Sequence, residues 1–168
     1  MKTDFLKIEN ETEEEFEKIA NKLLNNCAIK NHDSKYRLTE IEFYWTSPNH
    51  KDNSTYQRKH VDPKHGDWFF HYSGVDIALK NEIIDGFGGI LIRSIYSINE
   101  DKIYNGPMVC AMKLFSGTSA FSESIKTMII EYEFNKVEVQ KSERIGLGEN
   151  AKQSGTDKLN YRFFISLK

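Results

Sequence analysis

The stretch Y-R-L-T-E-I-E-F-Y-W, residues 36–45, decides the fold that this sequence predicts. It is rich in aromatic and β-branched residues, which favour an extended strand. Because side chains alternate across a strand, the apolar positions 41, 43 and 45 share a core face. Glu40, Glu42 and Tyr44 share the other face, which places carboxylates beside an aromatic ring. That second face is either a functional surface or the wet face of an edge strand.

Further elements are expected on both sides of this strand. Thr12 and Glu15 form a capping-box pair ahead of apolar residues at helical spacing, which predicts a helix over residues 13–25. Residues 46–66 predict a long loop, and 104–115 predict an Asn-Gly-Pro turn that opens a short helix. Strands are expected at 68–79 (broken at Ser73-Gly74), 88–97, 127–134, 136–145 and, after a glycine-rich loop, 161–167. We therefore expect one α+β domain over residues 1–168, a curved, largely antiparallel mixed sheet flanked by a few short helices.

Composition sets limits on the class of protein. A chain of 168 residues with 39% apolar and 12% aromatic residues is expected to fold as a globular domain. No apolar run approaches the roughly 20 residues that a membrane helix needs, and the acidic N-terminus lacks the apolar segment of a signal peptide. The two cysteines, Cys27 and Cys110, are far apart and are interpreted as buried thiols in a reducing compartment. A cytoplasmic monomer without a membrane partner is expected.

Charge is unevenly distributed over the chain. The net charge of −2 argues mildly against a nucleic-acid binder, whose contact face is normally basic. However, residues 140–168 carry six bases against three acids, and Lys51, Arg58, Lys59 and Lys64 form a second basic cluster. These residues form either one basic face or ordinary solvated charge.

Four segments in order resemble the alkyladenine (3-methyladenine) DNA glycosylase family. E-I-E-F-Y at 40–44 is similar to that family's E-T-E-A-Y strand, and I-L-I-R-S-I at 90–95 to its V-L-I-R-A strand. N-G-P-M-V-C at 105–110 is similar to its N-G-P-x-x-L-C turn, and R-I-G-L-G with the later L-N-Y-R-F-F-I to its closing segment. The helical I-A-N-K-L-L-N-N also resembles its A-x-x-L-L-G helix. The motifs are short, but their shared order spans residues 19 to 165.

The resemblance implies an active site without metal or cofactor. The family's catalytic glutamate falls on Glu42, which would orient and deprotonate the water that attacks the sugar. Arg93 matches the family's strand arginine beside that glutamate; the alternative is a structural ion pair with Glu40 or Glu42. Tyr44 matches a tyrosine that stacks on a base flipped out of the duplex, and the alternative is a core tyrosine.

The segment W-F-F-H-Y-S-G aligns with a family strand of Y-V-Y-I-I-Y-G type. Phe70 then takes the place of a base-stacking tyrosine, and Trp68 that of the preceding aromatic residue; core packing is the alternative for both. The chain departs from the family at three positions, 56, 73 and 76. Ser73 aligns with the tyrosine that wedges into the DNA stack, and Tyr56 aligns with a loop histidine that contacts the base, although His50 and His60 lie nearby.

Two further side chains are candidates for binding substrate. Asp76 stands where no acid is expected and is a second site carboxylate, a turn residue or a sheet-edge charge. His71 contacts substrate or is a packed histidine of an aromatic strand. The nearby basic residues Arg58 and Lys59, together with Arg144 and Lys152, are expected to contact DNA phosphates.

The function expected from the resemblance is excision of alkylated or deaminated purines in base excision repair. The partner is then damaged DNA. Two alternatives stay open, an N-glycoside hydrolase of small nucleosides or single-stranded nucleic acid, and a non-catalytic module that binds a modified base.

Overall fold

The strand predicted at residues 36–45 is confirmed as the middle of β2 (Ser34–Thr46), the central strand of the fold. The computed structural model describes residues 3–59, 64–118 and 127–167, with the side chains of residues 56 and 57 left out. One edge of β2 pairs with β5 (Gly86–Ser97), and its other edge pairs first with β1 (Cys27–Asn31) and then with β9 (Arg162–Phe164). Backbone hydrogen bonds therefore hold β2 from both sides.

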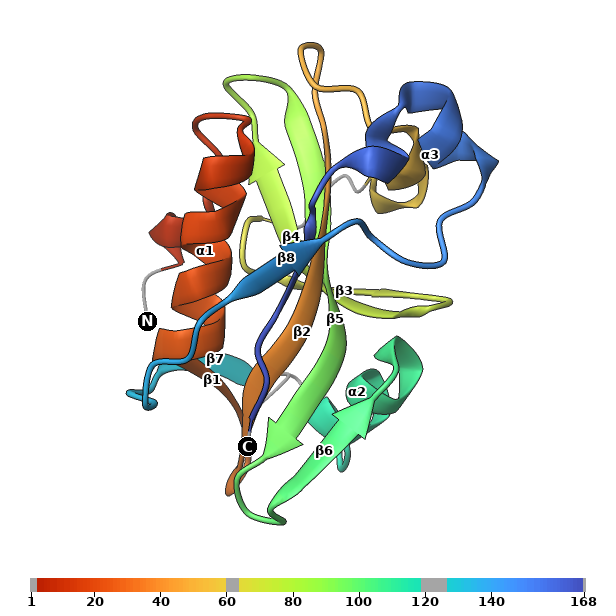
Figure 1. Cartoon of the computed structure of the whole chain (residues 1–168). Coiled ribbons are helices and arrows are strands. Elements are labelled where there is room, and N and C mark those ends of the chain that lie inside the picture. Colours follow the sequence, from red (N-terminus) through yellow and green to blue (C-terminus); the bar gives the residue numbers. More distant parts are fainter. Residues whose placement is uncertain (1–2, 60–63, 119–126, 168) are drawn as a thin grey trace.

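The sheet curls around its long central strands (Figure 1). Within the described residues its strands run in the order β3-β4-β5-β2-β1-β7, with β6 on β5 and β8 on β9. The strands not yet named are β3 (Trp68–His71), β4 (Gly74–Asn81), β6 (Lys102–Asn105), β7 (Met128–Glu131) and β8 (Gln140–Ser142). All pairings described are antiparallel. The α+β domain is confirmed, and the mixed component expected in the sheet does not occur among the described strands.

Helix α1 (Glu13–Asn26) confirms the helix expected at residues 13–25 and covers the core face of β2. Its apolar side is buried, and Phe16 stacks on Phe43 with ring centroids 5.0 Å apart. At its first turn the Thr12 hydroxyl accepts a hydrogen bond from the Glu15 backbone N–H at 3.3 Å. The Glu15 carboxylate in turn accepts from the backbone N–H groups of Glu9 and Asn10, which fixes the chain entering the helix.

This cap gives a first testable expectation. Replacing Thr12 by alanine removes an acceptor for an N–H group that has no partner within the helix, and should lower the free energy of unfolding by about 1 kcal/mol. Urea denaturation measures the change. Replacing Thr12 by serine keeps the hydroxyl and should leave the midpoint within error, and equal midpoints for all three proteins would contradict the assigned cap.

Three regions differ from the sequence prediction. The loop at 46–66 contains a short helix, η2 (Asn53–Arg58), and the glycine-rich loop contains α3 (Glu149–Ser154) and η3 (Thr156–Lys158). The strands expected at 127–134 and 136–145 shrink to β7 and β8. The reason lies at the end of α1, where the backbone N–H groups of Tyr132 and Phe134 bond to the carbonyls of Asn26 and Asn25 instead of a neighbouring strand.

The remaining elements follow the prediction. The broken strand at 68–79 is the β3–β4 hairpin, and the Asn-Gly-Pro turn leads into α2 (Pro107–Leu114), with Gly106 at φ 99° and proline in the first turn. A short η1 (Asp4–Leu6) precedes α1. Both cysteines are buried free thiols, as expected, and burial raises the pKa of Cys27 to about 11 and that of Cys110 to about 12. None of the helices in the described part of the chain has the length and apolarity to cross a membrane.

Candidate functional site

Two buried carboxylates lie side by side on the face of the sheet opposite to α1. Asp76 of β4 and Glu42 of β2 are both in register with Leu91 of the intervening β5. Directly opposed residues of antiparallel strands point to the same side of a sheet. Both carboxylates have no exposed surface. The alternation predicted for β2 is therefore confirmed. Of the two alternatives for its second face, the solvated face of an edge strand is wrong, because Glu42 is buried and β2 pairs on both sides.

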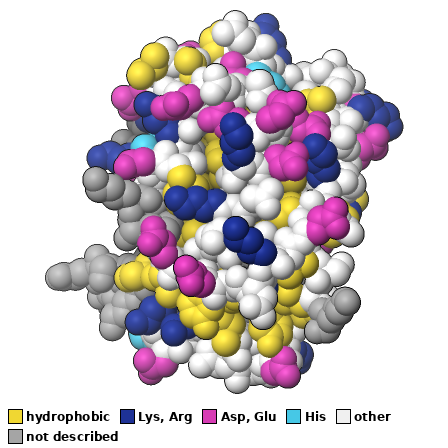
Figure 2. Space-filling view, turned by 60° about the vertical axis from the view of Figure 1, so that its left-hand side comes forward, with side chains coloured by type: hydrophobic (Ala, Val, Ile, Leu, Met, Phe, Trp, Pro, Cys, Tyr) yellow, Lys and Arg dark blue, Asp and Glu magenta, His cyan; other side chains and the backbone are white. Residues whose placement is uncertain are grey.

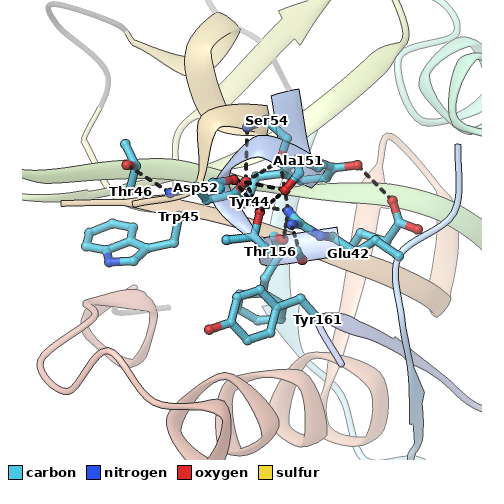
Figure 3. A network of polar contacts seen from close by, with 12 residues as sticks. Glu42, Tyr44, Trp45, Thr46, Asp52, Ser54, Ala151, Thr156 and Tyr161 are labelled. Atoms are coloured by element: carbon cyan, nitrogen blue, oxygen red, sulfur yellow. Dashed lines mark hydrogen bonds and ion pairs between the residues drawn. The ribbon is translucent and has the colours of Figure 1, made fainter. Parts of the chain in front are cut away.

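Glu42 is held by groups from three segments of the chain. Its Oε2 accepts from Arg93 Nη1 at 3.1 Å and from the Tyr44 hydroxyl at 3.0 Å, and Figure 3 shows the latter contact. Its Oε1 accepts from the backbone N–H of Ile145 at 2.9 Å. A buried carboxylate needs such charged and dipolar partners to stay ionised. The strand arginine thus lies beside Glu42, as expected.

Arg93 also links Glu42 to Glu40. Its Nε donates to Glu40 Oε1 at 3.1 Å, and Arg162 Nε donates to the same oxygen at 2.8 Å. This hydrogen bond from Arg162 raises the pKa of the arginine above its ordinary value. The ion pair proposed as the structural alternative for Arg93 is present, and it contacts both glutamates at once.

Tyr44 differs from the expected base-stacking tyrosine. The guanidinium carbons of Arg58 and Arg144 lie 3.6 and 4.6 Å from its ring centroid, and the residue is 6% exposed. Burial, together with the charge of Glu42, raises the pKa of its hydroxyl. Its ring lies against two guanidinium groups and its hydroxyl donates to Glu42, so Tyr44 orients this carboxylate from the pocket wall.

Arg144 is not a surface cation, which corrects its expected role in DNA contact. Its side chain is completely buried, and its Nη1 donates to Asp52 Oδ2 at 2.6 Å and to the Phe43 carbonyl at 3.1 Å. The other oxygen of Asp52 accepts from Ser54 and from the Thr156 hydroxyl, as the network in Figure 3 shows. This cluster ties η2, β2 and the chain around α3 together beside the site.

Arg58 is likewise buried and not on a basic rim. Its Nε lies 2.5 Å from Asp76 Oδ2, and the other oxygen of Asp76 lies 2.9 Å from His71 Nε2. Asp76 is thus a buried strand residue that pairs η2 with the β3–β4 hairpin, and neither a turn nor an edge charge. Gly89 leaves room for it, since a Cβ atom there would approach Asp76 Oδ2 to 2.5 Å.

A pocket of about 470 Å³ opens above these buried groups. Its size falls in the range of about 300–1,000 Å³ that is common for small-molecule sites. Tyr44, Arg93 and Ile145, the three residues that bind Glu42, line it, as do Arg58 and Ser73. The rest of the lining is contributed by Ser54, Tyr72, Leu91, Pro107, Gly146, Leu147, Gly148 and Asn150. The Glu42 carboxylate therefore lies directly behind residues of the pocket wall.

The two aromatic residues predicted to bind substrate lie on the other face of the sheet. Trp68 and Phe70 oppose Ile77 and Val75, which belong to the core. Both rings pack against Phe115, with centroids 5.2 and 4.6 Å away, and the Trp68 Nε1–H donates to a backbone carbonyl. Neither ring lines the pocket in the described structure, so the sheet does not bring Trp68 and Phe70 together with Glu42 and Tyr44. The physical reason is strand alternation, which turns residues 69 and 71 toward the carboxylates instead.

Phe69 and His71 are the β3 residues that share a face with Asp76 and Glu42. Phe69 is in register with Asp76, and its ring stacks on His71 with centroids 5.9 Å apart. His71 was a candidate from sequence, whereas Phe69 was missed. The alternation of β3 against Asp76 would have been the signal for it.

Tyr72 is the second residue that sequence comparison missed. It lies in the turn between β3 and β4, is 75% exposed and lines the pocket. Ser73, which the alignment placed at the wedge position, follows it in the same turn. Tyr56 lies in η2, and its side chain lies outside the described residues, as does His60. His50 bonds to the Tyr161 hydroxyl near α1, away from the pocket.

The surface cations are sparse near the site. Lys59 and Lys152 are exposed, and Lys152 pairs with Glu149 at 2.7 Å on α3, beside the pocket. On the face seen in Figure 2, Lys and Arg side chains are interspersed with Asp and Glu. A larger hollow of about 780 Å³ lies between α1 and residues 131–133, lined mainly by charged and polar side chains. Among the described residues, no group of three or more His, Cys, Asp or Glu side chains is placed to hold a metal ion.

A viral protein is similar to most of this chain. No protein-family model matches the chain. The chain is 29% identical to an uncharacterized protein, L759, of Acanthamoeba polyphaga mimivirus, in a match that covers 82% of this chain and 68% of the viral protein. The relative carries no described activity, so the site must be interpreted from its own geometry.

Proposed function

We propose that this protein is an alkyladenine DNA glycosylase-like enzyme that hydrolyses the N-glycosidic bond of a damaged purine nucleotide. The observation that carries the proposal is the buried Glu42, fixed by Arg93, Tyr44 and a backbone N–H directly behind a pocket of about 470 Å³. Its order of motifs along the chain and its single antiparallel sheet domain are consistent with this family.

Hydrolysis of an N-glycosidic bond requires one carboxylate in a fixed position. The bond from the sugar C1′ to the base nitrogen breaks, its electron pair leaves with the base, and positive charge develops on the sugar. Water then attacks C1′, and Glu42 accepts the proton that the water loses. A carboxylate can accept about four hydrogen bonds, and the described residues supply three donors to Glu42. One acceptor position of the carboxylate is left over. Because Glu42 has no exposed surface, the proposal requires the pocket wall in front of it to open for the attacking water, while the negative charge stabilises the sugar cation.

The exposed Tyr72 supports a duplex substrate. An enzyme that acts on a base inside a duplex must extrude it and fill the gap that it leaves. Tyr72 lies at the tip of a hairpin on the pocket rim, so its ring is the group available to enter the base stack. In this proposal Tyr72 acts as the wedge, the role for which sequence alignment had pointed to the next residue, Ser73.

The test of the function is an excision assay on defined DNA. Duplexes carrying one hypoxanthine, ethenoadenine or N7-methylguanine are incubated with the protein, and abasic sites are detected by alkaline strand cleavage. Damage-specific cleavage supports the proposal. Release from nucleosides or single strands alone would instead identify a small-substrate N-glycoside hydrolase.

A second candidate is a non-catalytic module that binds a modified base in the same pocket. The observation that favours it is the complete burial of Glu42, whose contacts resemble those of a structural carboxylate. Such a module retains lesion-containing DNA in a gel-shift assay without releasing the base. Specific retention combined with intact glycosidic bonds would select this candidate over the enzyme.

Replacing Tyr72 by alanine tests the role of the hairpin tip. Stacking of an aromatic ring on a base is worth about 1–3 kcal/mol, so the Kd for a lesion duplex should rise about tenfold or more. Affinity for the same lesion in a single strand should change little, because no gap has to be filled there. The Tyr72→Phe variant keeps the ring and serves as the control. Equal loss on both substrates would show that Tyr72 does not act as a wedge.

A further inference from the structure

Asp76 and Glu42 are two buried carboxylates on one face of the sheet, and Arg58 pairs with the first of them. The Arg58 guanidinium comes from η2, and its Nε lies 2.5 Å from Asp76 Oδ2. Its carbon also lies 3.6 Å from the centroid of the Tyr44 ring. The hydroxyl of that ring donates to Glu42. Arg58 is therefore linked to Glu42 through a single side chain, that of Tyr44.

Each arginine beside the Tyr44 ring has a buried carboxylate of its own. Arg58 pairs with Asp76, and Arg144, on which the same ring also rests, pairs with Asp52. A buried cation needs such a counter-charge, because burial without one is costly. With both cations neutralised in this way, Glu42 is left to the donors that orient it.

Removing the charge of Asp76 would leave Arg58 in search of another carboxylate. A guanidinium stays ionised in proteins and binds a carboxylate more strongly than a neutral oxygen. Asp52 already accepts four hydrogen bonds, which is about the capacity of a carboxylate. Glu42 accepts three and has one acceptor position left. Glu42 is therefore the carboxylate to which a released Arg58 would turn.

We infer that Asp76 is a positioning residue of the proposed enzyme, which holds Arg58 against Tyr44 and keeps it off Glu42. The inference rests on the proposed function, in which the acceptor position left on Glu42 takes the attacking water. An Arg58 guanidinium bonded to Glu42 would fill that position. Asp76 itself has no exposed surface and touches neither water nor substrate, so it acts through Arg58 alone.

The first test replaces Asp76 by asparagine and measures single-turnover excision from a hypoxanthine duplex. Asparagine keeps the shape of the side chain, but its neutral oxygen holds a guanidinium less firmly than a carboxylate does. The excision rate should fall about tenfold or more, toward the about 10²–10⁴ that a general base contributes. The Kd for the same duplex should stay within about threefold of wild type, because Asp76 offers no surface to DNA.

Removing the arginine as well should restore the rate. In Arg58→Met combined with Asp76→Asn no cation is left to turn to Glu42, and methionine fills part of the space over the Tyr44 ring. Excision should return to within about threefold of wild type. If Asp76 were merely structural, the double variant would lose the contacts of two residues and would be no faster than Asp76→Asn.

His71→Gln is the matched control for the other oxygen of Asp76. His71 Nε2 lies 2.9 Å from Asp76 Oδ1, so this substitution removes a partner of Asp76 and leaves the bond to Arg58 in place. Its excision rate should stay within about fivefold of wild type. A loss as large as that of Asp76→Asn would show that Asp76 does not act through Arg58.

The outcomes separate failure of the positioning role from failure of the function. A folded Asp76→Asn protein with wild-type rate overturns the positioning role, and so does a double variant that stays slow. If thermal melts show that Asp76→Asn does not fold, the double variant, which carries neither charge of the pair, and the His71 control decide by the same criteria. Wild-type protein that releases no base overturns the proposed function together with the positioning role. Recovery of the rate in the double variant supports both.

Discussion

Replacing Glu42 by glutamine should slow base excision at least about a hundredfold, within the range of about 10²–10⁴ that a positioned general base contributes. The amide cannot accept the proton of the attacking water, and it carries no charge to stabilise the sugar cation. It also cannot satisfy its neighbours. If the amide oxygen of the glutamine faces the Ile145 N–H, its NH₂ group points at the Arg93 guanidinium, which is also a donor. In the reverse orientation the NH₂ group points at the Ile145 N–H. Single-turnover excision from a lesion duplex measures the loss.

The matched control is Glu40→Gln, on the same strand and in contact with the same arginine. Glu40 is partly exposed and binds Arg93 and Arg162, whereas Glu42 is fully buried behind the pocket wall and also bonds to Tyr44 and Ile145. Partly exposed ion pairs are worth about 1 kcal/mol or less, so this variant should stay within about fivefold of wild type. Thermal melts of both variants check that they are folded. A folded Glu42→Gln protein with wild-type rate would remove Glu42 from the mechanism.

Sequence pattern was sufficient to predict the carboxylate side of the site. Alternation along β2 placed Glu42 and Tyr44 together on the face opposite to the core, an inference that needs only the period of a strand. The place of Arg93 beside Glu42 was expected from the family resemblance, with a structural ion pair as the alternative. The structure places these three side chains in direct contact.

Pattern was insufficient where the outcome depends on a partner strand or a distant residue. In W-F-F-H every residue is aromatic or imidazole, so periodicity cannot tell which face enters the core, and register with β4 decides it. Arg144 and Lys152 are both basic residues near the C-terminus, yet Arg144 is buried because Asp52 lies opposite it in space, 92 residues away along the chain. No charge count reveals such a pairing.

The Asp52–Arg144 pair carries the second large expected effect. Replacing Arg144 by methionine should lower the free energy of unfolding by about 3–5 kcal/mol, the usual result of removing one partner of a buried ion pair. Methionine fills part of the volume but donates no hydrogen bond, so Asp52 stays buried with neutral donors alone. The Phe43 and Thr156 carbonyls also lose the guanidinium groups that bond to them. With total stability of about 5–15 kcal/mol, a urea transition should show the loss clearly.

The pH dependence of this loss distinguishes a lost charge pair from a packing defect. Burial alone would raise the pKa of Asp52, but the hydrogen bond and the charge of Arg144 outweigh it and lower the pKa. A depressed carboxyl pKa stabilises the folded state above the unfolded value of about 3.9, and this contribution is lost as the pH falls through the folded value. In Arg144→Met the burial effect is no longer opposed, so Asp52 takes up a proton at higher pH and its penalty is relieved. The stability difference between the two proteins should therefore begin to shrink above about pH 4, as Asp52 of the variant takes up its proton, and should shrink further below about pH 4, as Asp52 of the wild type does. Adding Asp52→Asn to Arg144→Met should recover part of the lost stability at neutral pH, because it removes the unpaired charge. Arg144 would instead be a packing residue only if the stability difference between Arg144→Met and wild type did not change with pH and Asp52→Asn made the loss larger.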